Sequence, residues 1–328
     1  MIHETMVNQS NVVEFVLLGF PGVTGKFQIA VSLSFFVIYN IALFSNGIAL
    51  ILIIHQAHLH QPMYIIVANL ALSDLIFDTL TLPKIIAKYW FGDGSLSFLT
   101  CFFQMFFVHN LGSLDSLTIM MMAIDRFVAI CRPLHYSSII TNKVVMVICF
   151  IFWLIASLIG LAIAIMGALL PYCGPNKIKN CFCAFSSVVG LSCVDPLPTR
   201  HIAFTIGLIT HLLPLSFIIF SYIFIIKKIR KMAHVENWHK VFYTCTTHWI
   251  VIFLYFVPRL SVYTYNQFQV TFDADVTVLL ICIYTFVPHF TSPIIYCLRT
   301  KEIKENVKKI LKKTISVNGK MRDCNILT

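Results

Sequence analysis

Charged residues are scarce in this chain. Only 12% of its 328 residues are Asp, Glu, Lys or Arg, whereas 58% are hydrophobic, and the mean hydropathy is +0.84. A soluble domain carries roughly 25% charged residues, so this composition excludes a water-facing surface over most of the molecule. The net charge of +10 does not indicate a nucleic-acid partner, because Lys and Arg lie between and after apolar runs and form no basic stripe.

Strict alternation of apolar and polar residues is also missing. The chain instead contains seven continuous apolar stretches, near 27–54, 63–86, 99–130, 143–169, 201–227, 241–265 and 274–297. A membrane-spanning helix needs about 20 mainly apolar residues, and membrane barrels require alternation. Backbone polar groups in lipid must be satisfied within the segment. The sequence therefore predicts an all-α integral membrane protein, a bundle of seven transmembrane helices.

Three parts are expected along the chain: an N-terminal segment (1–26), the helical bundle (27–297) and a tail (298–328). In the tail, apolar residues recur at helical spacing among lysines, at Ile303, Val307, Ile310 and Leu311. This pattern predicts an amphipathic helix over 299–313 that lies on the anionic inner leaflet and contacts membrane lipid.

The distribution of positive charge predicts the orientation. Of the 24 Lys and Arg residues, seven lie on the side of the N-terminus and the other 17 lie on the opposite side. The positive-inside rule makes the richer side cytoplasmic and the N-terminus extracellular. Asn8 begins a glycosylation sequon on the outer side, in agreement with that orientation.

Internal repeats and catalytic motifs are not found. Seven spans do not divide into equal halves, which disfavours a transporter, although a transporter remains the more distant alternative to a receptor. The sequence contains neither an HExxH metal-binding motif nor a nucleophile and a general base at a catalytic spacing, so we do not expect an enzyme.

Polar residues occur inside the predicted spans at similar depth: Asn46, Asp74, Asp115, His289 and Ser292. Such groups are costly in a membrane, by about 2.5–3.5 kcal/mol on insertion scales. They form either a hydrogen-bonded core that fixes helix packing or a cation site. In the second interpretation Asp74, Asp115 and Ser292 bind Na⁺; no cofactor is required in either.

Five strings carry a family resemblance: LHQPMY (59–64), MAIDRFVAIC (122–131), SY (221–222), KVFYTCTTH (240–248) and PIIYCLRTKEI (293–303). They resemble, in order and at the expected helix ends, motifs of the odorant receptors of the rhodopsin-like G-protein-coupled family. The loop LPYCGPNKIKNCFC (170–183) is most similar to the fish-like, class I branch. The resemblance covers the chain from the first helix to the tail.

The resemblance implies a function. The chain would bind a small extracellular odorant within the bundle, activate a stimulatory heterotrimeric G protein and raise cAMP, in the plasma membrane of olfactory cilia. A non-olfactory receptor for a metabolite or hormone remains the alternative, because a fold does not encode the tissue of expression.

The resemblance also implies roles for single residues. Asp125, Arg126 and Tyr222 match positions that engage the G protein or lock the inactive state, and Pro293 and Tyr296 match a switch in the last helix. It further implies one disulfide between Cys101 and Cys183 and another between Cys173 and Cys193, with Cys181 left unpaired.

Ligand pockets form between the helices of a bundle. We expect this pocket to be lined by Met105, His109, Gly112 and Ser113, which share one helix face, by Thr210, and by Phe256, Arg259 and Tyr263. Arg259 and His109 would bind an anionic group on the ligand, since the planar guanidinium matches an oxyanion. The alternatives are that Arg259 extends outward to water or pairs with Asp273 or Asp275, and that His109 is only a packed core residue.

Overall fold

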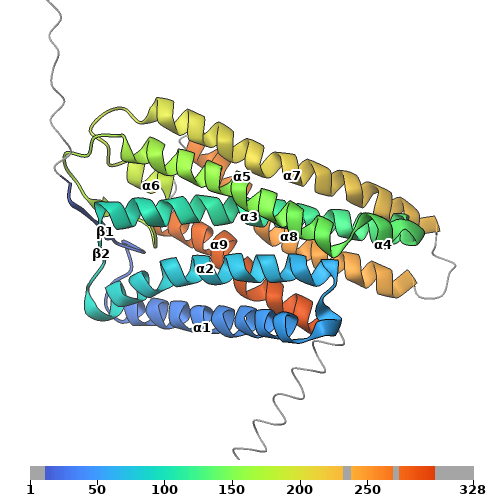
Figure 1. The fold of residues 1–328 in the computed structure, drawn as a ribbon. Helices are drawn as coiled ribbons and strands as arrows, with labels where there is room; N and C mark the ends of the chain where they lie inside the picture. The colour runs from blue at the N-terminus through green and yellow to red at the C-terminus, as the bar shows by residue number, and fades with distance from the viewer. Residues whose placement is uncertain (1–11, 232–237, 269–272, 300–328) are drawn as a thin grey trace, which may run out of the picture.

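The computed structural model describes residues 12–231, 238–268 and 273–299. Seven long helices run roughly along one another as a bundle (Figure 1). They are α1 (Lys26–His55), α2 (Pro62–Phe91), α3 (Phe98–Cys131), α5 (Asn142–Ala168), α7 (Leu197–Lys231), α8 (Trp238–Gln267) and α9 (Ala274–Arg299). The predicted all-α membrane bundle is confirmed.

The helix ends differ little from the predicted stretches. The largest difference is at the end of α2, which continues to Phe91 instead of ending near residue 86. The lysines near this end of α2, Lys84 and Lys88, do not end the helix, and Lys84 pairs with Asp93 beyond it, 2.9 Å away. The helix ends at Gly92, whose φ of 77° is a backbone conformation that glycine adopts without steric cost.

The surface of the bundle is apolar. Phe150, Leu158 and Phe217 are 64%, 68% and 50% exposed, whereas Asp74 and Asp115 are each only 2% exposed. By length and composition, five helices are suited to crossing a membrane: α1, α2, α5, α7 and the Ala274–Pro293 part of α9. In α8 the apolar segment is shorter, His248–Thr264. This inside-out distribution of polarity indicates that the helices face lipid.

A small sheet closes one end of the bundle, which we call the sheet end. Its strands are β1 (Glu14–Leu17), β2 (Ser95–Ser97) and β3 (Lys177–Ile178), in the order β2-β1-β3. Strand β1 is antiparallel to β2 and parallel to β3. The sequence did not predict this sheet, because strands of two to four residues are too short to show a periodicity. Phe15 and Leu17 of β1 are fully buried, so this strand is part of the core.

The remaining elements are short. Helix α6 (Phe185–Val189) lies near the sheet end, and α4 (Tyr136–Ile139) lies at the opposite end, which we call the Arg126 end (Figure 1). Two 3₁₀ turns, η1 (Ala57–Leu59) and η2 (Pro133–His135), complete the connections at that end.

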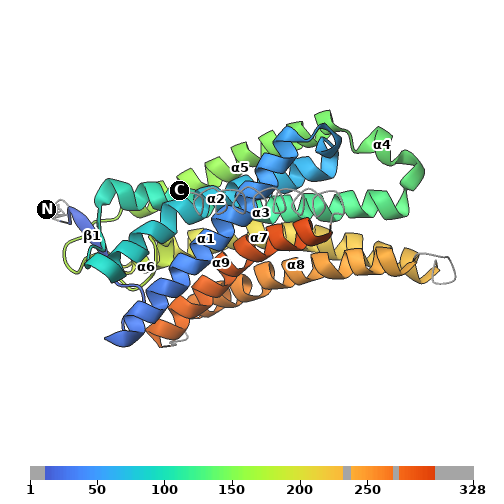
Figure 2. The ribbon, with the colours of Figure 1, turned by 90° about the horizontal axis from the view of Figure 1, so that it is seen from below.

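Helix α3 lies at the centre, in contact with α2, α5, α7 and α8. Helix α9 contacts α1, α2 and α8 and so closes the bundle; Figure 2 shows it alongside α1. Side chains from α2, α3 and α9 therefore meet halfway along the bundle, and those of α3, α7, α8 and α9 meet nearer the sheet end.

Candidate ligand-binding site and switch residues

A cavity of about 240 Å³ opens between the helices near the sheet end. Its walls come from α3, α5, α7, α8 and α9 and from Phe77 of α2, and its roof from α6 and the loop before it. Six predicted ligand-binding residues line it: His109, Gly112, Ser113, Thr210, Arg259 and Tyr263. Most of the other lining side chains are apolar, including Val108, Ile163, Phe182, Ile206, Val262 and Ile281.

The prediction that Met105 and Phe256 line the ligand cavity is wrong, because neither side chain borders it. Met105 is fully buried on the side of α5, where a Cβ added to Gly167 would lie 3.3 Å from its sulfur. Phe256 is buried against the ring of Tyr255, with the ring centroids 4.9 Å apart. Helical spacing groups residues on one face, but only the packing of the neighbouring helices decides which part of that face borders the cavity.

Arg259 is held inside the bundle and is 5% exposed. Its Nη1 donates to the hydroxyl of Tyr255 at 2.9 Å and lies 3.3 Å from Nε2 of His211. The guanidinium also lies 4.4 Å from the ring centroid of Tyr255 and 5.0 Å from that of Tyr284. These contacts contradict the alternative that Arg259 extends outward to water.

The proposed acidic partners of Arg259 are engaged elsewhere. Both carboxylate oxygens of Asp275 accept the backbone N–H of Gly22, each at 3.1 Å, and Asp273 accepts the N–H of Asp275 at 2.9 Å. Within the described part of the chain, no carboxylate lies within ion-pair distance of Arg259. Its Nε is buried without a hydrogen-bond partner.

The cavity as a whole carries an excess of positive charge. Among the described residues, its lining includes two arginines, Arg200 and Arg259, and no Asp or Glu. Nε of Arg200 and Nε2 of His109 are buried and also lack a hydrogen-bond partner. Apolar walls with a few convergent donors are the usual form of a small-molecule site, and here the donors favour an anion.

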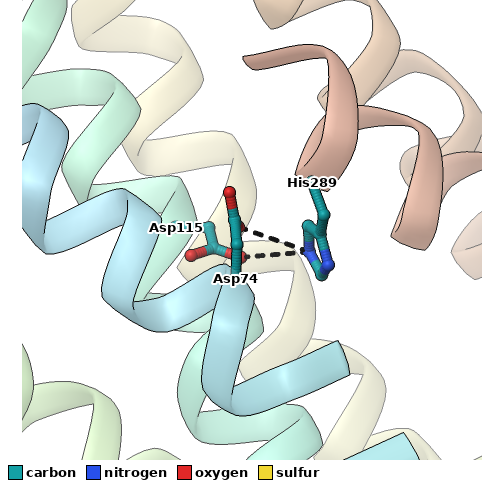
Figure 3. Close-up of side chains that lie close together, drawn as sticks. All are labelled: Asp74, Asp115 and His289. Carbon is teal, nitrogen blue, oxygen red and sulfur yellow. Dashed lines mark ion pairs between the residues drawn. The ribbon is translucent and has the colours of Figure 1, made fainter. Parts of the chain in front are cut away.

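A second polar cluster lies deeper in the core, where α2, α3 and α9 meet. Asp74 and Asp115 point toward His289 (Figure 3). Nε2 of His289 lies 3.7 Å from an oxygen of Asp74 and 3.8 Å from one of Asp115. Nδ1 of the same ring lies 2.8 Å from a carboxylate oxygen of Asp78. A hydrogen bond from Nδ1–H to this oxygen holds the ring with Nε2 directed toward the other two acids.

This core cluster brings together most of the polar residues that the sequence placed at one depth. Asn46 donates to the backbone oxygen of His289 at 3.0 Å, and Ser73 donates to Asp115 at 2.6 Å. Ligand atoms of Asp74, Asp115 and His289 all lie within 4.8 Å of one another, close enough for a cation. Ser292 is buried, but no hydrogen bond among the described residues joins it to either carboxylate.

The predicted switch residues lie near the Arg126 end. Asp125 and Arg126 form an ion pair at 3.8 Å. The hydroxyl of Tyr136 donates to Asp125 at 2.7 Å. Burial and the adjacent carboxylate raise the pKa of Tyr136, so it remains a donor. The hydroxyl oxygen of Tyr222 lies 2.7 Å from Nδ1 of His248, and this hydrogen bond links α7 to α8.

Helix α9 contains the other two predicted switch residues. Pro293 is buried inside this helix. Tyr296 belongs to the same helix, but its side chain lies outside the described residues, as do Asn8 and the predicted amphipathic helix after residue 299.

The structure contains both disulfides that the resemblance implies. Cys101 at the start of α3 is bonded to Cys183, and Cys173 to Cys193. The first bond fixes the loop before α6 to α3 directly above the cavity. Cys181 takes part in neither of these two bonds, as the resemblance implies.

Comparison with known proteins decides the family. Residues 35–314 match the family model described as Olfactory receptor. The chain belongs to the olfactory receptor family. It is 33% identical to the human Olfactory receptor 6B1 over 92% of this chain and 96% of the relative. It is 35% identical to the human Olfactory receptor 56A5, over 93% and 97%, and 33% identical to Olfactory receptor 56B34 of Mus musculus, over 94% and 96%.

Membership of this family settles the class of function. The chain is an odorant receptor of the G-protein-coupled type, which signals through a G protein to raise cAMP, and it is not an enzyme. It is a multi-pass protein of the plasma membrane. The assignment to the fish-like branch stays a prediction.

Proposed function

We propose that this odorant receptor detects small molecules that carry an anionic group, and that Arg259 binds that group. The observation that carries the proposal is a buried guanidinium, without a carboxylate partner among the described residues, in the wall of a mostly apolar cavity.

The argument is one of charge balance. A buried cation without a counter-ion has lost its hydration, and the neutral groups around Arg259 offset only part of that loss. A carboxylate or sulfate on the ligand supplies the missing charge in a form that the planar guanidinium matches. The unpartnered Nε of Arg259 gives the anion one donor, and Nε2 of His109 gives a second when the imidazole proton is on that nitrogen.

The size of the cavity limits the rest of the ligand. At about 240 Å³ it is smaller than the roughly 300–1,000 Å³ typical of pockets for drug-sized molecules. Its walls are mostly apolar, so the ligand carries a compact aliphatic or aromatic body. The hydroxyl of Tyr263 supplies a further polar contact, whereas that of Thr210 already donates to the backbone oxygen of Ile206 at 2.6 Å.

Activation follows from a preference of the ligand for one helix arrangement. Arg259 and Tyr255 of α8 both hydrogen-bond to the backbone oxygen of Gly112 on α3. An anion that draws Arg259 into the cavity weakens this contact between the two helices. The resulting shift of α8 changes its contact with α7 at Tyr222 and His248 and exposes a groove near Arg126 for the G protein.

The same charge argument applies to the core cluster. We propose that Asp74, Asp115 and the hydroxyl of Ser292 bind one Na⁺ when His289 is neutral. Replacing Na⁺ by N-methyl-D-glucamine should then shift the agonist concentration for half-maximal response in the wild type. The shift should disappear in Asp74→Asn; an equal shift in both proteins would contradict the ion site.

The orientation is also proposed. The sheet end faces outward and the Arg126 end faces the G protein, in line with the charge asymmetry and with two disulfides at the sheet end. The tail would contact inner-leaflet lipid, and no nucleic-acid partner is proposed. An N-terminal epitope should be labelled on intact cells, and antibody staining of olfactory tissue should find the receptor in cilia.

A panel of carboxylic acids, alcohols and steroids, read by cAMP in cells expressing the receptor, tests the ligand class. Acids should activate at the lowest concentrations. Activation by neutral members with no response to any acid would contradict the proposed class.

A further inference from the structure

Two free thiols touch each other at the sheet end. The sulfur atoms of Cys181, in the loop above the cavity, and Cys282, in α9, lie 3.6 Å apart. The two residues are separated by 101 positions in the sequence. Both side chains are buried, so the contact belongs to the packed core and is not a chance approach of mobile surface groups.

The other cysteines whose side chains the structure describes divide by position. Cys101, Cys173, Cys183 and Cys193, all at the sheet end, are disulfide-bonded. Cys131 ends α3 and Cys149 lies in the second turn of α5, both in the half of the bundle nearer Arg126, and both are free. Among these side chains, Cys181 and Cys282 are thus the free thiols in the half of the molecule where the two disulfides lie.

We propose that Cys181 and Cys282 are joined in the mature receptor as a third disulfide bond, which ties the loop above the cavity to α9. The inference depends on the proposed outward placement of the sheet end, because disulfides form and persist in the secretory pathway and at the cell surface. Epitope labelling tests that placement separately.

The bond forms by two exchange steps. The Cys181 thiolate attacks the disulfide of an oxidoreductase or of oxidised glutathione, RSSR, and releases one RS⁻. The Cys282 thiolate then attacks the Cys181 sulfur of the mixed disulfide and releases the second RS⁻. Each cysteine loses one electron, RSSR gains two, and the two thiol protons pass to solvent or to the released thiolates.

The exchange is expected during folding. In the packed structure, burial and the hydrogen bond with Cys282 raise the pKa of the Cys181 thiol well above its ordinary value. A thiol with a raised pKa is a poor nucleophile at neutral pH, so the pair would react before the loop packs against α9.

The third bond would complete a connection across the top of the bundle. Cys183, two residues from Cys181, is already bonded to Cys101 of α3. Phe182 between them lines the cavity, as do Ile281 and Tyr284 beside Cys282. Helices α3 and α9 would then be cross-linked through three loop residues, and α7 and α8 would be left as the helices that can move when a ligand enters.

A gel-shift count of free thiols tests the proposal on the full-length receptor expressed in mammalian cells. The protein is denatured in SDS and EDTA without reductant and labelled with a 5-kDa polyethylene-glycol maleimide. Cys282→Ser should label one thiol more than the wild type, because Cys181 loses its partner. Cys149→Ser, the matched control at a free thiol, should label one fewer. If Cys282→Ser also labels one fewer, the two thiols are free and the proposal is wrong.

Peptide mapping of the wild type covers the case in which a variant misfolds. A non-reduced digest should contain a cross-linked pair of peptides bearing Cys181 and Cys282, which separates on reduction. Recovery of both cysteines as alkylated thiols would overturn the proposal. The buffer contains EDTA, which removes any metal ion that the two thiols share. Such metal-bound thiols would be alkylated like free thiols, and this result would also contradict the proposed disulfide.

Discussion

Two buried polar groups of this receptor have opposite imbalances of charge. Near the sheet end, Arg259 and Arg200 line a cavity that has no carboxylate among its described lining residues. Deeper in the bundle, three carboxylates, Asp74, Asp78 and Asp115, surround the single imidazole of His289. The upper group has no acid to balance its arginines, and the lower group has one titratable imidazole for three acids.

The difference shows how one bundle can hold both a ligand site and a structural core. The lower group is closed: its acids and imidazole are each at most 2% exposed, so its balance is set by protons or a small cation. The upper group borders a cavity large enough for an organic molecule. The negative charge that the upper group lacks can therefore be supplied by the ligand. The cavity is filled or empty according to which ligands are present outside the cell.

Removing one member of the closed group should have the largest effect. Asp78→Ala deletes the acceptor of the His289 Nδ1 proton at 2.8 Å. Breaking a buried pair from one side costs about 3–5 kcal/mol, so we expect a much lower melting temperature in detergent and strong loss of surface expression. Asp78→Asn, which keeps an acceptor oxygen, should lose less. Wild-type stability in Asp78→Ala would mean that the pair is not formed.

Arg259→Ala should have the opposite profile. Truncating one partner of a buried charged contact costs about 2–5 kcal/mol of binding, so responses to acidic ligands should disappear or need at least thirtyfold more agonist. Surface expression should be unchanged, because the substitution removes an unbalanced charge. Arg259→Lys keeps the charge without the planar fork and should be intermediate. Equal cAMP responses in Arg259→Ala and the wild type would remove the anion site.

Two glycines of the bundle give a matched pair. A Cβ at Gly112 would lie 2.7 Å from Nη1 of Arg259, the end of a flexible side chain, whereas one at Gly160 would lie 2.6 Å from the backbone oxygen of Phe106. Gly112→Ala should therefore displace Arg259 and reduce acid potency about tenfold with normal expression. Gly160→Ala should lower stability by about 1–3 kcal/mol through overpacking. A reversed pattern of potency and expression would contradict the structure.

The smallest effect is expected at Ser113. It lines the cavity, but its hydroxyl already donates to the backbone oxygen of His109 at 2.7 Å. Ser113→Ala should change acid potency less than threefold in the cAMP assay. A larger change would show that the hydroxyl turns to the ligand, and would place the anion nearer α3 than Arg259 alone indicates.

The sequence predicted the seven helices well, because long apolar runs have one stable form in lipid. It grouped Asp74, Asp115 and His289 correctly by depth. It missed Asp78, although Asp78 follows Asp74 by four residues and therefore shares its helix face. That spacing could have identified the third acid.

Other features depended on packing between distant segments. The side of α3 and α8 that borders the cavity follows from their rotation against α5 and α7, so Met105 and Phe256 could not be excluded beforehand. His211, next to the predicted Thr210, contacts Arg259 only because α7 and α8 adjoin at that level. The approach of Cys282 to Cys181 has no local signal at all.

The most direct test of the central claim is a cycle of two ligands and two receptors. The best acid from the panel and the alcohol of the same carbon skeleton are titrated by cAMP on the wild type and on Arg259→Gln. We predict that the wild type prefers the acid by at least tenfold and that the variant shows no preference. The same preference for the acid in both receptors would contradict the account.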